Sequence, residues 1–433
     1  MNEKPYEIRD PIHGLVQYSD IEREVINSPV FQRLRRIRQL AWTDYVYPGA
    51  THNRFEHSIG VMHVAGRIYD ALLRDQRSKE IISSEYKLNN EDIARQRQIV
   101  RLAALTHDLG HGPFSHAAES LFPRDSQDNN RRISHEEYSS CIIRGEIADI
   151  LGMHKSANAL AFDAEEIASY IDGTPKDRKV ALFKAIISGT IDSDRMDYLL
   201  RDAYHCGVRY GQYDIERIIN TLGVCEDDED EGEFQVGINI DGIHAAEGLV
   251  IARFMMFTQV YLHKTRMIYD YHFENCMEEI LSSTGGNFPN ARETKGRKEF
   301  LAWDDWRVLG SLANGGGGKH GELIRNRNHY RRIYETKETF SNELDHEKAL
   351  KKFEKMKEKT KHLGCIALNA EKTWYKQSLG SDILVRPSEG SKIKAQQLSN
   401  LSSVVKSLIP VNQRRLYVPS ENADSARKII ESN

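Results

Sequence analysis

Apolar residues recur with a helical spacing over more than half of the chain, and this spacing is the strongest constraint on its fold. From Ser28 to about residue 280, they return every three or four positions, the period of an amphipathic α-helix. The pattern is clearest in Phe31–Leu40, Ile59–Leu73, Ile99–Leu105, Ile167–Tyr170, Ala181–Ile187 and Leu249–Met256. The spacing therefore predicts a mainly α-helical fold.

Short β-hairpins are expected at two places within this helical region. Tyr6–Tyr18 mixes apolar residues with the turn residues of Asp10-Pro11 and His13-Gly14, which is typical of a hairpin. The acidic stretch Glu226–Glu233 predicts a solvated loop. The alternating Phe234–Ile240 that follows it predicts a strand of a small inserted hairpin.

The sequence changes character after about residue 281. Turn residues dominate Ser282–Asn287, and we interpret the glycine run Asn314–Gly318 as a mobile loop. Further elements are expected as a charged helix at His346–Lys361, strands at Ile383–Val385 and Leu416–Val418, and a helix at Ala423–Ile430. We therefore predict a helical main domain over residues 1–280 and a smaller mixed α+β lobe over residues 281–433.

Composition narrows the class of protein. The 433 residues carry a formal net charge of −4, which is not typical of a dedicated nucleic-acid binder, although local basic clusters leave such a partner open. No apolar run approaches the roughly 20 residues that cross a bilayer, and the first ten residues lack the apolar core of a signal peptide. Five scattered cysteines indicate reduced thiols. We expect a cytoplasmic protein with no membrane partner.

Histidines and carboxylates gather in His52–Ser58, Thr106–Glu119 and Ile191–Asp202. The adjacent pair His107-Asp108 follows an apolar helical stretch, where a carboxylate needs a partner such as a divalent cation. His111 lies four residues after His107, which predicts that both share one helix face. Gly112-Pro113 then breaks the helix.

Two further histidines lie close to helix signals. His116 and Glu119 are three residues apart, so they can share a face of the next helix, where the carboxylate can orient the imidazole. Ser134 and Glu137 have the spacing of a capping box, which predicts that a helix begins beside His135. This density of histidine, carboxylate and glycine indicates a metal-dependent catalytic site.

These residues carry a family resemblance. The order H…HD…D, represented by His57, His107-Asp108 and Asp194, is similar to the signature of the HD superfamily. The strings DPIHG, FQRLRRI, HNRFEHS and HDLGHGPFSH, with the element D-x-D-x-x-DY-x-x-RD, resemble the deoxynucleoside triphosphate triphosphohydrolases, including the animal SAM-and-HD-domain proteins and their bacterial relatives. The resemblance covers roughly residues 6–280. It implies an HD-domain helical core that hydrolyses dNTPs to deoxynucleoside and triphosphate.

The resemblance implies that His57, His107, Asp108 and Asp194 bind a metal ion. Two imidazoles and two carboxylates suit a divalent cation such as Mn, Mg or Fe, with Zn also acceptable. The ion would bind an α-phosphate oxygen and draw off charge that develops on phosphorus.

Catalytic and substrate-binding roles are implied in the same way. His116 and Glu119 would form the catalytic pair, and His111 and His135 would contact phosphate. The residues implied to bind the phosphates or the deoxyribose are Gln39, Arg54, Arg195, Tyr198, Asp202, Arg253, Tyr261 and Lys264. Phe257 and Leu262 stand where some relatives carry polar residues, so the substrate base stays open.

A nucleotide activator is also implied, because related activator sites lie between subunits of a homo-oligomer, here a dimer or tetramer. The matching positions are Asn27, Gln32 and Arg35; relatives that recognise guanine carry Asp where this chain has Asn27. Neighbouring arginines form a basic stripe that fits a solvated helix face or an effector or subunit contact: Arg33, Arg35, Arg36 and Arg38.

Two other hypotheses remain. An HD-type phosphodiesterase or nuclease, acting on cyclic nucleotides or single-stranded nucleic acid, would use two metal ions and recruit His111 and His135. A nucleotide sensor without activity would not need the pair His116 and Glu119. The number of bound ions distinguishes the first of these from the dNTP hydrolase, and turnover lost in His107→Ala excludes the second.

Overall fold

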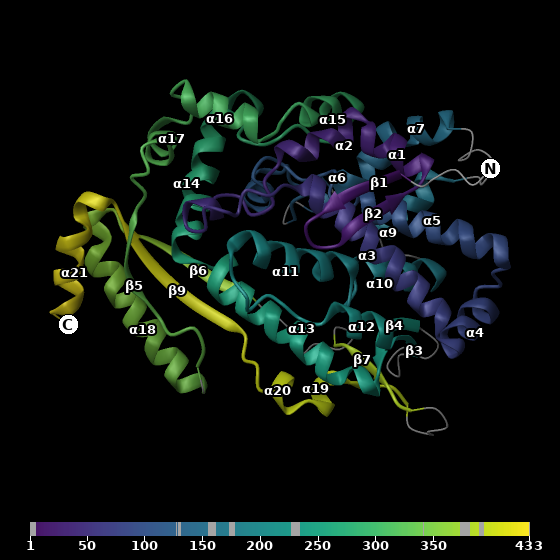
Figure 1. Ribbon diagram of the computed structural model, residues 1–433. Helices are drawn as coiled ribbons and strands as arrows, with labels where there is room; N and C mark the ends of the chain where they lie inside the picture. Colours follow the sequence, from purple (N-terminus) through teal and green to yellow (C-terminus); the bar gives the residue numbers. More distant parts are fainter. Residues whose placement is uncertain are drawn as a thin grey trace.

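A computed structural model describes residues 6–126, 128, 131–154, 162–172, 178–226, 234–340, 342–372, 382–388 and 394–432. The described part is mainly helical, with small sheets at its edges (Figure 1). The predicted fold class, a helical core with hairpins and a smaller α+β part, is confirmed. Most of the acidic loop predicted at Glu226–Glu233 lies outside the described residues.

Helices dominate the first 280 residues. The α-helices are α1 (Asp20–Asn27), α2 (Pro29–Gln32), α3 (Arg54–Arg74), α4 (Gln76–Glu85), α5 (Asn90–Thr106), α6 (His135–Ile142), α7 (Ala148–Met153), α9 (Ala164–Asp172), α10 (Arg178–Ser188), α11 (Ser193–Cys206), α12 (Ile215–Thr221), α13 (Ile243–Met256) and α14 (Lys264–Ile280). The strands are β1 (Tyr6–Asp10), β2 (Gly14–Tyr18), β3 (Leu222–Glu226) and β4 (Phe234–Asn239). Both predicted hairpins are present, because β1 pairs with β2 and β3 with β4.

Helix α3 is the centre of this core. It packs against α5 and α11, and its side chains are buried along most of its 21 residues. Asn53 caps α3 in a capping box with Glu56, and the predicted box of Ser134 and Glu137 starts α6 at His135. Well-defined helix starts fix where the first-turn side chains of α3 and α6 point, and both turns face the site described below.

The helix expected over Phe31–Leu40 is wrong after its first residues. Helix α2 ends at Gln32, a single 3₁₀ turn covers Arg33–Arg36, and Ile37 is extended. The chain leaves the helix because it pairs with the segment before α3: the Ile37 carbonyl accepts from the Arg54 amide. The four arginines therefore do not form one stripe.

Arg33 is buried and joins separate segments by hydrogen bonds, so it is not part of a solvated helix face. It is 1% exposed, and its guanidinium donates to the carbonyl oxygens of Trp303, Leu109 and His111 at 2.9, 3.1 and 2.8 Å. Asp305 adds a third bond to the same loop by accepting from the Phe114 amide at 2.8 Å. The loop after His107 is thus fixed from both sides.

Residues after 281 form further elements. They are α15 (Thr294–Leu301), α16 (Asp305–Ala313), α17 (Gly318–Arg325), α18 (Glu343–Thr360), α19 (Leu398–Leu401), α20 (Ser403–Lys406), α21 (Ala423–Glu431), β5 (Arg331–Glu335), β6 (Ile366–Lys372), β7 (Leu384–Arg386), β8 (Gln396–Gln397) and β9 (Val411–Val418). The glycine run forms the turn between α16 and α17, and Gly318 already belongs to α17, so its interpretation as a loop is correct only up to Gly317.

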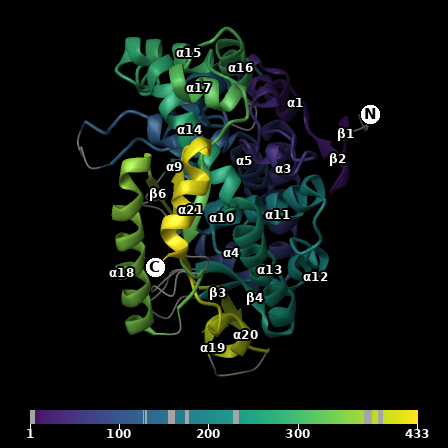
Figure 2. The same ribbon diagram turned by 90° about the vertical axis from the view of Figure 1, so that its left-hand side faces the viewer.

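These elements contribute to two places in the molecule. Strands β5, β9 and β6 form an antiparallel sheet that packs with α18 and α21, which lie side by side in Figure 2. Strand β7 instead joins the sheet of the main part, parallel to β4. The domain boundary predicted between residues 280 and 281 stays a prediction, because β7 follows this boundary in the chain but joins the sheet formed by residues that precede it. Among the described residues, no helix combines the length and apolarity needed to cross a bilayer.

Replacing Arg33 with Met should lower the free energy of unfolding by about 3 kcal/mol, because three buried carbonyl oxygens lose their donor. Chemical denaturation measures this change. The same substitution at Arg74, exposed at the end of α3, should change stability by less than about 0.5 kcal/mol. Equal changes in stability at the two positions would contradict a stabilising role for the three hydrogen bonds of Arg33.

Candidate active site

A cleft of about 920 Å³ opens beside the first turns of α6 and α11. Side chains from α3, α6, α9, α10, α11 and the loop after α5 are among those that line it. Those that carry polar or charged groups are Gln39, Arg54, His107, Asp108, His111, His116, Arg131, Ser134, His135, Glu136, Glu137, Asp172, Lys184, Ser188, Asp194 and Tyr198. The cleft therefore joins imidazoles, carboxylates and cationic groups.

Three of the predicted metal ligands converge in this region. Ligand atoms of His57, His107 and Asp194 all lie within 4.8 Å of one another. The Asp194 Oδ1 atom is 3.1 Å from His57 Nε2 and 3.8 Å from His107 Nε2. The fourth predicted ligand, Asp108, has its carboxylate 3.2 Å from His107 Nε2 and 3.5 Å from His57 Nε2.

Helix ends hold these groups. His57 lies in the first turn of α3, His107 follows the last residue of α5, and Asp194 lies in the first turn of α11. The Nδ1 atom of His107 is 2.7 Å from the Ala104 carbonyl, and that of His57 is 2.8 Å from an Asp197 oxygen. A carbonyl and a carboxylate accept hydrogen bonds, so both rings carry their proton on Nδ1.

The hydrogen bonds at Nδ1 leave the Nε2 atoms of His57 and His107 available as ligands. Both are buried, and neither has a hydrogen-bond partner in the described part of the chain. Burial alone would lower the pKa of His57, but the neighbouring carboxylates of Asp194 and Asp197 raise it to about 10. The same carboxylates that favour a proton here favour a cation. These donors therefore fit a divalent metal ion.

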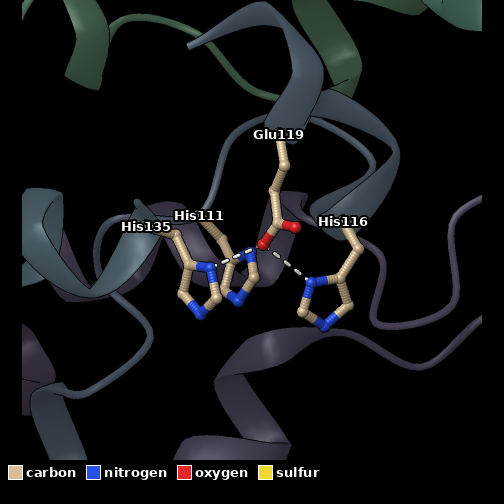
Figure 3. A group of neighbouring side chains, drawn as sticks. All are labelled: His111, His116, Glu119 and His135. Atoms are coloured by element: carbon tan, nitrogen blue, oxygen red, sulfur yellow. Dashed lines mark hydrogen bonds and ion pairs between the residues drawn. The ribbon is translucent and has the colours of Figure 1, made fainter. Parts of the chain in front are cut away.

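A second group lies in the same cleft (Figure 3): His111, His116, Glu119 and His135. Glu119 Oε1 lies between two imidazoles, 2.9 Å from His116 Nδ1 and 2.6 Å from His135 Nδ1. The His111 ring stacks on that of His135, with centroids 3.8 Å apart. The predicted pair of His116 and Glu119 thus exists, and Glu119 also holds His135.

Charges in this second group are uneven. Burial and the neighbouring Arg54 lower the pKa of His111 well below its usual value, so His111 is neutral. Burial opposes protonation of His135, yet hydrogen bonding to Glu119 and the charge of Glu136 raise its pKa. Burial would raise the pKa of Glu119, but His116 and His135 lower it, so Glu119 is ionised.

One expected detail of this group is wrong. His111 does not share a helix face with His107, because α5 ends at Thr106 and the chain turns there. The turn nevertheless brings His111 Nε2 to 3.3 Å from Asp108 Oδ1. The two histidines therefore meet at Asp108 from different directions, which the spacing of four residues did not predict.

Only some of the predicted substrate-binding residues line the cleft. Gln39, Arg54 and Tyr198 do so, and Arg54 donates to Asp108 and, at 2.8 Å, to Ser115. Arg195 pairs with Asp192 inside its own helix turn.

Other predicted residues lie behind or beyond the cleft wall. The Tyr261 hydroxyl donates to Asp202 at 2.6 Å, and the second Asp202 oxygen lies 2.7 Å from His52 Nε2. The Arg253 guanidinium is 5.6 Å from the Phe257 ring centroid. Lys264 lines a different, smaller cleft.

The predicted activator residues also lie outside the main cleft. Asn27 is exposed at the end of α1. The Arg35 guanidinium donates to Gln32 at 2.8 Å and lies 3.4 Å from the centroid of the Phe55 ring. Gln32 and Arg35 thus form one exposed pair.

The sequence did not predict the residues that lie behind the predicted metal ligands. Asp197 lies in the D-x-D-x-x-D element, but the sequence did not predict a role for it. Arg201, four residues later, donates two hydrogen bonds of 2.8 Å to its carboxylate. His13, from the first hairpin, reaches the same carboxylate. The i to i+4 spacing could have indicated the pair of Asp197 and Arg201. No sequence signal links His13 to them.

Gly60 makes room for this buried pair. A Cβ at Gly60 would lie 1.9 Å from Asp197 Oδ1 and 2.4 Å from Arg201 Nη2. Gly60→Ala should therefore destabilise the protein by about 1–3 kcal/mol and weaken metal binding. Thermal unfolding and calorimetric metal titration measure the two effects.

Gly152→Ala in α7 is the matched control, because a Cβ there meets no atom within 4 Å. It should be neutral or stabilising, since alanine favours a helix by about 0.5–1 kcal/mol over glycine. Wild-type metal affinity in Gly60→Ala would contradict the close packing.

Comparison with known proteins agrees with this geometry. The HD domain family model matches residues 54–184, and the model of the HD associated region matches residues 213–371. A solved hypothetical protein from Aquifex aeolicus superposes with a TM-score of 0.75 at 30% identity, covering 99% of this chain and 100% of that one.

Curated relatives include an uncharacterized Bacillus subtilis protein, YwfO, 37% identical over 59% of this chain and 51% of its own. Another is the Dictyostelium discoideum homologue of the deoxynucleoside triphosphate triphosphohydrolase SAMHD1, 34% identical over 59% of this chain and 46% of its own. The chain spans about half the length of the curated relatives that it matches. With the family match and the full-length structural relative together, the chain belongs to the HD-domain superfamily.

Proposed function

We propose that this HD-domain hydrolase cleaves deoxynucleoside triphosphates into deoxynucleoside and triphosphate in a metal-dependent reaction. The observation that carries the proposal is the pair of buried Nε2 atoms of His57 and His107, which have no hydrogen-bond partner among the described residues and lie beside a cleft lined by cationic side chains. Relatives named as deoxynucleoside triphosphate triphosphohydrolases, in Dictyostelium, chicken and human, support the substrate class.

A divalent ion would be held by His57, His107, Asp108 and Asp194, and the donor set suits Mn, Mg or Fe, with Zn acceptable. Such an ion supplies Lewis-acid polarisation of a phosphate oxygen. Asp108 also has to balance the charge of Arg54, which donates to it. Arg54 therefore fixes the direction of the Asp108 carboxylate.

His116 is proposed to supply the proton that the leaving group needs. A water oxygen bonds to the α-phosphorus, the bond from phosphorus to the 5′-oxygen breaks, and that oxygen takes a proton from His116 Nε2. His116 is suited to this because Glu119 holds its Nδ1 and its side chain is 56% exposed. The water's oxygen leaves in the triphosphate, and the proton that this water loses replaces the one that His116 gave to the 5′-oxygen.

Cationic groups in the cleft would offset the triphosphate, which carries about four negative charges. His135 has a raised pKa, and Arg131 and Lys184 lie in the cleft wall. Neutral His111 can contribute a hydrogen bond to a phosphate oxygen without adding charge. These four side chains come from the loop after α5, the segment before α6, α6 itself and α10.

Recognition of deoxyribose is proposed beside Tyr198. Tyr198 lines the cleft, and its ring centroid is 6.1 Å from that of Tyr261. Tyr261 is fixed by Asp202, which His52 also contacts. This arrangement gives the sugar a rigid aromatic wall that can exclude a 2′-hydroxyl, with Gln39 available to read the 3′-hydroxyl.

Activation by a nucleotide, bound at Asn27, Gln32 and Arg35 between subunits of a dimer or tetramer, is the remaining part of the proposal. The exposed pair of Gln32 and Arg35 supports it, because a hydrogen-bonded amide and guanidinium can meet a base edge and a phosphate. Turnover measured with pairs of dNTPs tests this part.

A second candidate is hydrolysis of a cyclic or single-stranded phosphodiester. It is favoured by the ligand atoms of His111, His116, Glu119 and His135, which lie within 4.8 Å of one another and could hold a second ion. Two metal ions can clamp both oxygens of a displacement. Counting bound Mn²⁺ per chain separates this candidate from the dNTP hydrolase.

Incubation with each dNTP and Mn²⁺ should release deoxynucleoside and triphosphate. Asp194→Ala should lower this turnover at least about 1,000-fold, because one ion ligand is lost. Asp424→Ala, which changes an exposed Asp in the first turn of α21, should leave turnover unchanged. Chromatography of the products measures both. No product from any dNTP, alone or in pairs, would refute the proposed substrate class.

His116→Ala should lower kcat by about 10²–10⁴-fold with little change in KM, because protonation of the leaving oxygen is lost. Glu119→Gln should lower it by about 10–100-fold, since the acceptor that His116 and His135 share loses its negative charge. His244→Ala is the matched control: His244 pairs with Glu247 at the same three-residue spacing but lies on the surface. Equal activity of the His116→Ala and His244→Ala variants would refute the proposed role of His116 as proton donor.

A further inference from the structure

Asp197 is a carboxylate saturated by donors in the protein interior. Its Oδ1 atom lies 2.7 Å from His13 Nε2 and 2.8 Å from Arg201 Nη2. Its Oδ2 atom lies 2.8 Å from both His57 Nδ1 and Arg201 Nε. Asp197 and Arg201 are fully buried, and the His13 side chain is only 3% exposed. Each oxygen therefore has one arginine donor and one histidine.

The first hairpin delivers His13 to this carboxylate. Asp10, at the end of β1, accepts the backbone amides of Ile12 and His13 at 2.8 and 2.9 Å, which shapes the turn. Its second oxygen pairs with Arg201 at 2.8 Å. One residue thus binds both the turn that carries His13 and the guanidinium that faces Asp197.

The hydrogen bonds specify the proton positions. A carboxylate with four neighbours can only accept, so His13 donates from Nε2 and His57 donates from Nδ1. His57 then presents its other nitrogen, Nε2, to Asp194 and Asp108. The direction of this nitrogen follows from the plane of the Asp197 carboxylate.

We infer that His13, in the first hairpin, is a positioning residue for the metal ligand His57 and acts through Asp197. The inference rests on the metal site of the proposed function. Without the donor of His13, Arg201 alone holds Oδ1, and the carboxylate can rotate away from the plane that aims His57. Groups that orient a metal-bound imidazole typically contribute about 10–100-fold to metal affinity.

The experiment is calorimetric titration of the full chain with Mn²⁺ alone, together with the melting temperature of the metal-free protein. His13→Ala should raise the Kd for Mn²⁺ by about 10–100-fold. His13→Gln, which can keep a donor near Nε2, should recover part of this loss. Gln17→Ala, whose side chain bonds to Glu7 on the exposed side of the same hairpin, should keep the wild-type Kd.

A double-mutant cycle separates positioning from simple loss of stability. Asp197→Asn should weaken Mn²⁺ binding by itself, and adding His13→Ala to it should cause little further change, because the two act on one bond to His57. If the two substitutions instead raised the Kd for Mn²⁺ independently, so that their fold-changes multiplied in the double variant, the inference would be overturned.

A wild-type Kd in His13→Ala, or equal losses in His13→Ala and His13→Gln, would overturn the inference as well. If His13→Ala does not fold, His13→Gln against wild type still tests it. Because the probe is Mn²⁺ without nucleotide, the test stands even if no dNTP is hydrolysed.

Discussion

Compensation of buried negative charge is the constraint on which the rest of this molecule depends. Asp108 and Asp197 are buried in one helical core, where an unpaired carboxylate would be strongly unfavourable, and Asp194 lines the cleft beside them. Arg201 neutralises Asp197, and Arg54 neutralises Asp108. Asp194 instead lies 3.1 Å from His57 Nε2 and 3.8 Å from His107 Nε2, and within the described residues no salt bridge joins it to an arginine. Its negative charge is therefore available to the cation of the proposed metal site.

Much of the helical core was predictable because local spacing reports local structure. Helices α3, α5, α10 and α13 appear where apolar residues recur with a helical period, and capping residues gave the start of α6. The pattern failed at Phe31–Leu40. There the chain forms backbone bonds with the segment before α3, and an interaction with distant residues leaves no periodic trace in the sequence.

The site shows the same division. The order of His57, His107-Asp108 and Asp194 indicated a metal centre, and the structure brings these residues together. The sequence could not show that His13 reaches Asp197 or that Lys264 faces another cleft, because both depend on how distant elements pack. Trp303 and Asp305 likewise lie beyond the boundary predicted at residue 281, yet Trp303 accepts a hydrogen bond from Arg33 and Asp305 accepts one from Phe114, in the loop after His107.

The parallel pairing of β4 with β7 has a consequence for synthesis on the ribosome. Ile238 faces Val385 across this pair, so about 145 residues must be made after β4 before its open edge is covered. Until then, β4 exposes unpaired backbone groups, which are templates for aggregation. Arg386 then locks the late strand by bonding to Asn239 and Asp75. A nascent chain that ends before this strand would therefore expose an aggregation-prone edge of β4, which β7 covers in the complete fold.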